Sequence, residues 1–286
     1  MKKMLTLTVM IGLLLSSSAS ALVGAGFHWG FDFTTTMNDV KDENMFTVKD
    51  LGIDSLSGVV IPDELLNTSF MSVSRSGFDR TPINFGGKIF VDVLPVEIEI
   101  SVNMGVWEYD ASVKYMSGVD TVNGNVEPKY EELSLNLDAA GLNYFGVDKT
   151  PYGKFHTDIT LKKTFKKIPI IKPSFGAGMS VHFATPVVSA DLLKSAFNIT
   201  DNIGNINPDD LKDPAKIKDL LDEILDGAKK PKTGMHFLLG LKLKVPVIPL
   251  AVYADGKYMI LFDDIEDGVG VNTKGFLVNV GLLFDL

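Results

Sequence analysis

The chain of 286 residues contains no cysteine, so no disulfide holds its fold together. It also lacks a long apolar run. The longest, Leu5 to Leu15, falls short of the roughly 20 residues that a transmembrane helix needs. If this chain crosses a membrane, it therefore crosses with strands.

Basic residues are fewer than acidic ones, with 27 Lys and Arg against 36 Asp and Glu, and the net charge is −9. An acidic chain is a poor partner for nucleic acid, whose affinity for proteins depends on basic residues near its phosphates. The sequence shows no repeated alternation of basic and aromatic residues that would suggest otherwise. It also contains no motif from which we would predict a cofactor.

The N-terminus has the three parts of a signal peptide. Lys2 and Lys3 give a positive start, the apolar run follows, and Ala19-Ser20-Ala21 offers small residues at a cleavage site. We therefore expect residues 1–21 to be removed and residues 22–286 to form one domain. Residue 22 is Leu rather than Cys, so we expect no lipoprotein anchor.

Eight segments alternate apolar and polar side chains with the period of two that is typical of β-strands. They cover about residues 27–33, 83–92, 96–104, 155–165, 175–183, 235–244, 250–258 and 274–286. A tilted strand of roughly 9–11 residues crosses the hydrocarbon core of a bilayer. The apolar faces would then contact lipid and the polar faces would line a lumen. Thr157 and Lys163 are exceptions on the lipid side, and Lys163 lies near enough to a turn to reach the headgroups.

The connections between these segments alternate in length. Short turns that contain proline occur at 94–95, 166–173 and 245–249, whereas the intervening connections are mostly long and polar. The latter cover about residues 37–81, 110–152, 184–232 and 263–273. Short turns on one side and long loops on the other are typical of outer-membrane barrels. A soluble β-sandwich, the competing interpretation, has no reason to sort its loops this way.

We therefore predict an all-β fold, a closed antiparallel up-and-down transmembrane barrel of eight strands. Weak strand signals at 71–74 and 133–137 indicate either strands that rise beyond the membrane or a further pair that would make ten. In the third long loop, Asp213 and Pro214 are suited to begin a helix, and an apolar stripe leads to Gly227. We expect this helix to pack on the barrel mouth or on neighbouring loop residues.

The last strand ends in a recognisable pattern. Asn279 is followed by Gly281, and then by Phe284 and the final residue Leu286. This resembles the C-terminal signal by which the outer-membrane assembly machinery recognises its substrates. With the signal peptide, it makes the chain similar to small bacterial outer-membrane β-barrel proteins. The resemblance implies export, insertion by the barrel-assembly machinery, and lipid or lipopolysaccharide around the barrel.

All four histidines fall on the predicted lumen face. Counting back from the turn at 166–173 places His156 opposite His182 and Asp158 opposite Ser180, with His236 at a similar height. Imidazole and carboxylate groups suit Zn, Cu or Ni, so His156, His182, His236 and Asp158 are candidate metal ligands. The alternative is a hydrogen-bonded lumen network. With Ser180 the same set has the residue types of a hydrolase, but it lies in no local catalytic motif, and we predict no enzyme.

Charges of both signs occupy the other end of the predicted lumen. They are Asp92, Glu97, Glu99, Lys162, Lys242 and Lys244. Eight strands enclose a space that side chains can fill, so these charges should pair and close the lumen. The predicted function is therefore a structural or surface-interaction role carried by the long loops. The alternative is a channel for a small solute or apolar ligand, through a barrel of ten or more strands.

The C-terminal pattern yields a test. Replacing Phe284 and Leu286 with asparagine should leave export intact but strand the protein in the periplasm, where it would be degraded. Immunoblots of separated periplasmic and outer-membrane fractions would measure this. Normal outer-membrane levels of the variant would contradict the assignment of the pattern.

Overall fold

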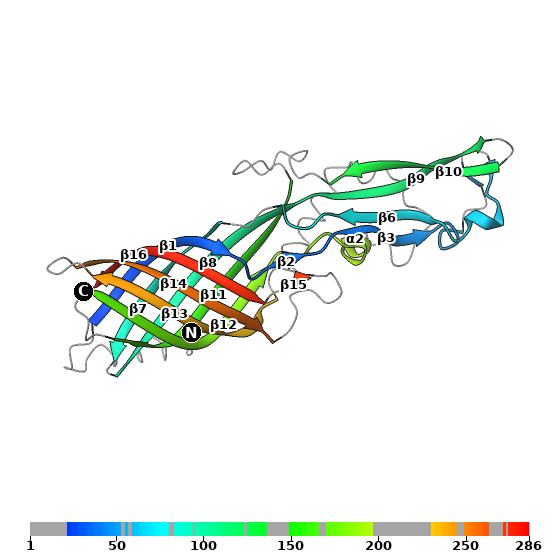
Figure 1. The fold of residues 1–286 in the computed structure, drawn as a ribbon. Helices are drawn as coiled ribbons and strands as arrows, with labels where there is room; N and C mark the ends of the chain where they lie inside the picture. Colours follow the sequence, from blue (N-terminus) through cyan, green and yellow to red (C-terminus); the bar gives the residue numbers. More distant parts are fainter. Residues whose placement is uncertain are drawn as a thin grey trace.

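The computed structural model describes residues 22–52, 55–56, 59–79, 83–93, 95–122, 125–135, 149–165, 170–196, 230–244, 249–262, 271–272 and 274–285. Eight strands form a closed antiparallel barrel (Figure 1). They are β1 (Leu22–Asp32), β7 (Ile83–Val93), β8 (Val96–Tyr109), β11 (Thr150–Thr164), β12 (Ile171–Ala184), β13 (Lys232–Lys244), β14 (Leu250–Leu261) and β16 (Gly275–Asp285). The order around the barrel is β1-β16-β14-β13-β12-β11-β8-β7, and β1 closes the ring by pairing with β7. The eight-stranded prediction is confirmed, and the ten-stranded alternative is wrong.

The two faces of the barrel wall differ as the alternation predicts. Outward apolar side chains are exposed, with Trp29 54% and Leu239 72% accessible, whereas inward polar ones such as Glu99 and His182 are 0% accessible. A surface of this kind suits contact with lipid. Of the two predicted exceptions, Lys163 donates from Nζ to the carbonyl of Pro95 at the short β7–β8 turn, at 2.7 Å.

A second sheet continues from one end of the barrel. It has the strand order β10-β9-β6-β3 and projects beyond the barrel mouth in Figure 1. The strands are β3 (Val40–Thr47), β6 (Ser69–Arg75), β9 (Ala111–Val122) and β10 (Asn125–Ser134). Only Asp110 separates β8 from β9. We call these four strands the outer sheet.

The outer sheet contains the weak strand signal at 71–74, which lies in β6, and the first part of the signal at 133–137, which lies in β10, and both strands rise beyond the barrel. Residues 136–137 lie outside the described residues. The sequence pattern gave no sign of β3 and β9, which lie in segments expected to be loops. In β9, Tyr115 and Met116 are both buried, which breaks the alternation. In β3 the pairing with β6 shifts register three times, and Asp42 has φ 51°.

Small elements complete the barrel mouth and the outer sheet. β2 (Thr36–Met37) pairs with β15 (Val271–Asn272), and β4 (Ser55–Leu56) pairs with β5 (Val59–Val60). The 3-10 turn η1 (Asp63–Leu65) precedes β6, and α2 (Ala190–Ala196) contacts β3. Within the described ranges, every helix is too short or too polar to span a membrane. The predicted signal peptide and the predicted helix at 213–227 lie outside the described residues.

The outer sheet has a hydrophobic core that continues into Trp107, Tyr109 and Tyr152 at the barrel mouth. Val73 and Val113 are fully buried at facing positions of β6 and β9, and Leu193 of α2 is buried in the same cluster. A partly buried ion pair adds to it, because Arg75 donates from Nη1 to Glu43 at 2.6 Å and to the carbonyl of Val188 at 3.2 Å.

A charged contact fastens the outer sheet to the barrel rim. Lys149, next to the start of β11, lies with its Nζ 2.6 Å from Asp110 and 2.7 Å from Asp79. These two carboxylates come from the β8–β9 junction and from the segment before β7. The hydrogen bonds that Lys149 donates to these carboxylates raise its pKa, and the bond to Asp110 has the larger effect. Asp79, Asp110 and Lys149 lie in three different segments that connect the outer sheet with the barrel, so the contact holds these three segments together.

The closed pairing of the barrel strands predicts that the outer sheet can unfold while the barrel stays folded. Val113→Asp would place an unpaired carboxylate in the outer-sheet core and cost about 3 kcal/mol or more. We expect the outer sheet to become protease-sensitive while the barrel keeps its heat-modifiable migration in detergent gels. Lys41→Asp, at an exposed position of β3, is the control. Loss of the barrel's migration shift in Val113→Asp would contradict two independent units.

Candidate functional site

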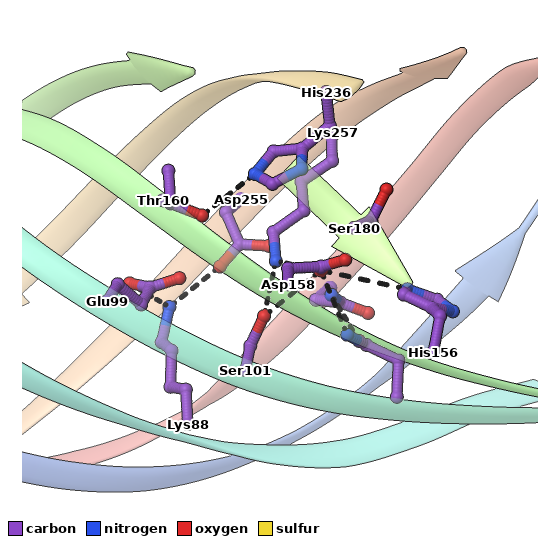
Figure 2. A network of polar contacts seen from close by, with 12 residues as sticks. Lys88, Glu99, Ser101, His156, Asp158, Thr160, Ser180, His236, Asp255 and Lys257 are labelled. Atoms are coloured by element: carbon purple, nitrogen blue, oxygen red, sulfur yellow. Dashed lines mark hydrogen bonds and ion pairs between the residues drawn. The ribbon is translucent and has the colours of Figure 1, made fainter. Parts of the chain in front are cut away.

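The barrel lumen holds most of the buried polar side chains, and its inner half contains a chain of ion pairs. Lys162 Nζ lies 2.6 Å from Glu97 Oε1 and 2.6 Å from Glu99 Oε2. Lys88 Nζ lies 3.4 Å from Glu99 Oε2 and 2.8 Å from Asp255 Oδ2. Acid and base alternate along this chain, so each charge has an opposite charge beside it. Figure 2 shows the Lys88, Glu99 and Asp255 part of it.

A second polar group occupies the middle of the lumen (Figure 2). Asp158 Oδ2 accepts hydrogen bonds from Lys257 Nζ at 2.7 Å, Ser101 Oγ at 3.1 Å and Asn103 Nδ2 at 3.3 Å. Lys257 also donates to Ser101 at 2.6 Å. Lys257 and Asp158 are 1% and 0% accessible. The Asp158 carboxylate is thus already neutralised by an ammonium group of the same protein.

The four histidines are all buried in the lumen. His156 and His182 pair directly across β11 and β12, as the short turn between them predicts, and their rings stack with centroids 4.9 Å apart. His236 Nε2 lies 2.8 Å from Thr160 Oγ1. His28 lies between Tyr253 and Asn103, with both contacts at 2.8 Å.

Glycines on the lumen face leave room for two of these rings. A Cβ on Gly86 would stand 2.7 Å from His28 Nε2, and a Cβ on Gly178 would stand 2.7 Å from the His236 ring. Each would also lie within 2.0 Å of a backbone carbonyl of the adjacent strand. These positions therefore require glycine for reasons of packing.

The candidate metal ligands do not assemble into a metal site. Among the described residues, no group of three or more His, Cys, Asp or Glu side chains is arranged to hold an ion. His156 Nε2 approaches Asp158 Oδ2 only to 3.7 Å, and His236 binds Thr160 instead. Lys257 Nζ lies 2.7 Å from Asp158 Oδ2, so Asp158 is paired with an ammonium group in this structure.

The residue types of a hydrolase site are also present, but they are not arranged as a Ser-His-carboxylate triad. Ser180 Oγ and His182 Nε2 lie 2.8 Å apart. The carboxylate that would orient the histidine is missing from its other nitrogen, because His182 Nδ1 has no hydrogen-bond partner within the described part of the chain. Both side chains are at most 1% accessible, so a substrate has no access to them in this conformation.

Side chains close the lumen at both ends. Toward the outer sheet, the ring of Phe78 packs 5.9 Å from Trp107 and 5.1 Å from Tyr152, measured between centroids. Below these rings Lys154 binds Asp32 and Thr34. At the inner end, four buried side chains form an apolar cluster, namely Phe90, Ala251, Tyr253 and Leu283. A cavity beside this cluster measures about 20 Å³, which is room for about one water molecule.

Part of the predicted charge network is seen directly, because Glu97, Glu99 and Lys162 come together. Lys242 places its Nζ 4.8 Å from the ring centre of Phe90. Asp92 and Lys244 are half-buried at the inner rim. The prediction missed several charged residues that do belong to the lumen network, namely Asp32, Lys88, Lys154, Asp255 and Lys257. All occupy inward positions of the alternation, which is the signal that could have found them.

The observed C-terminal strand agrees with the face pattern on which the assembly signal was based. Asn279 and Gly281 face the lumen, and Asn279 Oδ1 accepts a hydrogen bond from Asn84 at 2.8 Å. Phe284 is 47% accessible on the outside of the barrel. The side chain of Leu286 lies outside the described residues. The role of this pattern in assembly stays a prediction.

No protein-family model and no curated protein matches the chain. Solved structures that are similar to it include two outer-membrane proteins. One is the outer membrane protein OprG from Pseudomonas aeruginosa, with 8% identity over 93% of this chain and 97% of that chain, and a TM-score of 0.35. The other is the outer membrane protease OmpT from Escherichia coli, with 11% identity over 94% and 99% of the two chains, and a TM-score of 0.32. At these values neither structure transfers an activity to this chain.

The ion pairs around Lys162 can be tested by comparing single and combined substitutions. Lys162→Met removes the positive charge beside the buried carboxylates of Glu97 and Glu99. Removing one partner of a buried ion pair lowers the free energy of unfolding by about 3–5 kcal/mol. Adding Glu97→Gln and Glu99→Gln should restore part of that stability, measured as the thermal midpoint in detergent. Lys163→Met, one residue away on the outer face, is the matched control. Strictly additive losses would show that the three charges do not act together.

Proposed function

We propose that this chain is an integral protein of the bacterial outer membrane. In this proposal its barrel is a closed, non-conducting anchor, and the outer sheet contacts other molecules at the cell surface. The role is non-catalytic. The observation that carries the proposal is the buried core of the outer sheet beyond the barrel mouth, where Val73, Val113 and Leu193 are inaccessible, because closing a barrel does not require such a core.

The exterior of the barrel supports the membrane anchor. Apolar side chains cover it along all eight strands, as shown by exposed residues such as Phe85, Ile159 and Phe237. The hydrocarbon core of a bilayer accepts only structures whose backbone groups are all paired, and the closed ring meets this condition. The first and last barrel strands, β1 and β16, begin and end at the side of the short turns, which corresponds to the periplasm in such barrels.

The interior supports an anchor rather than a channel. An aromatic group lies at the outer end, and ion pairs and an apolar cluster together fill the inner half. The cavity of about 20 Å³ is too small for any solute larger than water. Opening a passage would separate buried opposite charges such as Lys257 and Asp158, and that would cost several kcal/mol.

The outer sheet supports a surface-interaction role. One of its faces is covered by α2 and the segment before it, and the other carries polar groups. These include Ser112, which donates to Glu132 at 2.6 Å, and Lys114, whose Nζ lies 3.4 Å from Asp42. Segments that stand on a rigid scaffold outside a membrane are where binding residues concentrate.

Cysteine labelling tests the topology, and the absence of native cysteine removes any background. Lys41→Cys, in the outer sheet, should react with a membrane-impermeant maleimide on intact cells. Ile170→Cys, 54% accessible at the β11–β12 turn, should react only after the outer membrane is permeabilised. Labelling of Ile170→Cys on intact cells, or protection of Lys41→Cys, would refute the orientation.

Planar-bilayer recording tests the closed lumen. The purified protein should give no steady conductance above the lipid background. Substituting small residues for the closing rings, as in Phe78→Ala with Trp107→Ala, should leave the current absent, because the ion pairs below still fill the lumen. Steady conductance by the unmodified protein would favour a channel over an anchor.

A further inference from the structure

The outer sheet ends in an open strand edge at β10, and we propose that this edge binds an extended segment of a partner protein in which basic and apolar residues alternate. The segment would pair with residues 129–134 of β10, which we call the docking edge. This inference rests on the proposed surface role, because it names the kind of molecule that the outer sheet contacts.

β10 forms one border of the outer sheet. In the order β10-β9-β6-β3 it pairs with β9 alone among the described strands, and it runs along the border of the sheet in Figure 1. The opposite border differs, because α2 contacts β3 and the pairing of β3 with β6 shifts register three times. An exposed edge is a template for a further strand, so β10 is the border to which a partner can add.

The hydrogen bonds of β10 show which of its backbone groups face outward. The N–H of Leu135 donates to the carbonyl of Ala111 at 2.9 Å, which makes these two residues a hydrogen-bonded pair. In an antiparallel ladder such pairs alternate with pairs whose backbone groups point away from each other. Regular pairing continues from there to Tyr130. The N–H and C=O groups of Ser134, Glu132 and Tyr130 therefore point away from β9, toward the open edge.

Pro128 limits the docking edge at its other end. Proline has no N–H to donate, and the register of β10 against β9 shifts between Lys129 and Tyr130. Within sheets proline is found mainly in edge strands and at bulges, which agrees with the place of β10 at the border. An added strand can therefore form continuous backbone hydrogen bonds only between Pro128 and the end of β10.

The two faces of the docking edge differ in polarity. Leu133 stands directly opposite Val113, which is fully buried in the core, and Leu133 itself is a partly buried side chain packed against that core. On the other face Glu132 is exposed. Successive side chains of an added strand alternate between the two faces. Apolar residues of the segment would therefore cover Leu133, and basic residues would reach Glu132.

The Glu132 carboxylate can accept a further donor. Ser112 Oγ donates to its Oε1 at 2.6 Å, and this donor is neutral. Lys114 stands directly opposite Glu132, but its Nζ lies 3.4 Å from Asp42 and 4.9 Å from the centre of the Tyr130 ring. A carboxylate has acceptor sites on both oxygens. A lysine or arginine of the segment can therefore bind Glu132 while Ser112 keeps its hydrogen bond.

Charge also decides between a basic partner and a second copy of this chain. On β10, Glu127, Glu131 and Glu132 are exposed against the single ammonium group of Lys129. Two copies of β10 paired antiparallel about Glu131 or Glu132 would place a carboxylate directly opposite the same carboxylate. Like charges at directly opposite positions are destabilising, whereas a basic segment complements them. In strand addition, backbone hydrogen bonds supply affinity and the alternating side chains supply specificity.

Fluorescence anisotropy of the full chain in a neutral detergent tests the docking edge. The probe is a fluorescein-labelled peptide of alternating lysine and valine that is long enough to span the edge. We expect saturable binding of this peptide. A peptide of the same composition with its lysines grouped at one end, and one of alternating glutamate and valine, should not bind. Equal binding of the grouped peptide would overturn strand addition, because it would show attraction to charge alone.

Substitutions in β10 separate the side-chain and backbone contributions. Glu132→Lys should weaken binding by about fivefold or more, because it places like charges together. Glu127→Lys, beyond Pro128, is the matched control and should leave the affinity unchanged, since salt at physiological strength screens exposed charges beyond about 8 Å. Ser134→Pro removes one outward N–H and should weaken binding by about threefold to tenfold, whereas Ser134→Ala should not.

Hydrogen exchange gives an independent readout of the same edge. The bound peptide should slow exchange within residues 125–134, where outward amides gain partners. Protease resistance of the outer sheet verifies folding, and if Ser134→Pro fails to fold, a peptide with N-methylated backbone replaces it and should not bind. Unchanged exchange in β10, binding that Glu132→Lys leaves unchanged, or dimers of the chain through β10 would overturn the proposal.

These measurements are made in detergent, so they do not depend on which side of the membrane the outer sheet faces. Absence of peptide binding, together with labelling of Lys41→Cys on intact cells, would overturn the docking edge and leave the surface role standing. Peptide binding together with protection of Lys41→Cys would support the docking edge and refute the surface role.

Discussion

The pairing of every backbone group within the wall is the constraint on which the rest of this structure depends. In hydrocarbon an unpaired N–H or C=O has no water to bind, so a sheet must close on itself. Closure here is the pairing of β1 with both β16 and β7, which joins the two ends of the chain's strand order. Once the ring is closed, alternation alone sends one face of every strand to lipid and the other to the lumen.

A ring of only eight strands makes that lumen narrow, and the narrowness governs its chemistry. Opposite walls are close enough for Lys88 to reach Asp255 and for Lys257 to reach Asp158. Charges buried this way are tolerated only beside an opposite charge, so the network is also what fills the barrel. The same packing leaves the histidines and Ser180 with at most 3% of their surface accessible.

Outside the hydrocarbon core, water can form hydrogen bonds with the backbone groups of an edge strand, so a sheet there does not have to close on itself. The outer sheet accordingly shows bulges, shifts of register and open edges that the barrel lacks. Its stability comes from ordinary burial, with residues such as Val73, Val113 and Leu193 inaccessible to solvent. The barrel therefore depends on complete backbone pairing, whereas the outer sheet depends on the burial of apolar side chains, although β8 runs almost directly into β9. In the proposed function, this division would let the outer sheet change without altering the barrel.

The sequence by itself determined the eight barrel strands, their faces and the side of each turn, because a period of two is a local property of the chain. It also determined the register of His156 with His182, since one short turn joins their strands. Only the tertiary structure decided which charges meet across the lumen, such as Lys88 with Asp255 and Lys257 with Asp158. It likewise decided that β3, β6, β9 and β10 form one sheet from two separate connections. Those contacts depend on which strands lie opposite after closure, and residues far apart in sequence carry no local signal of that.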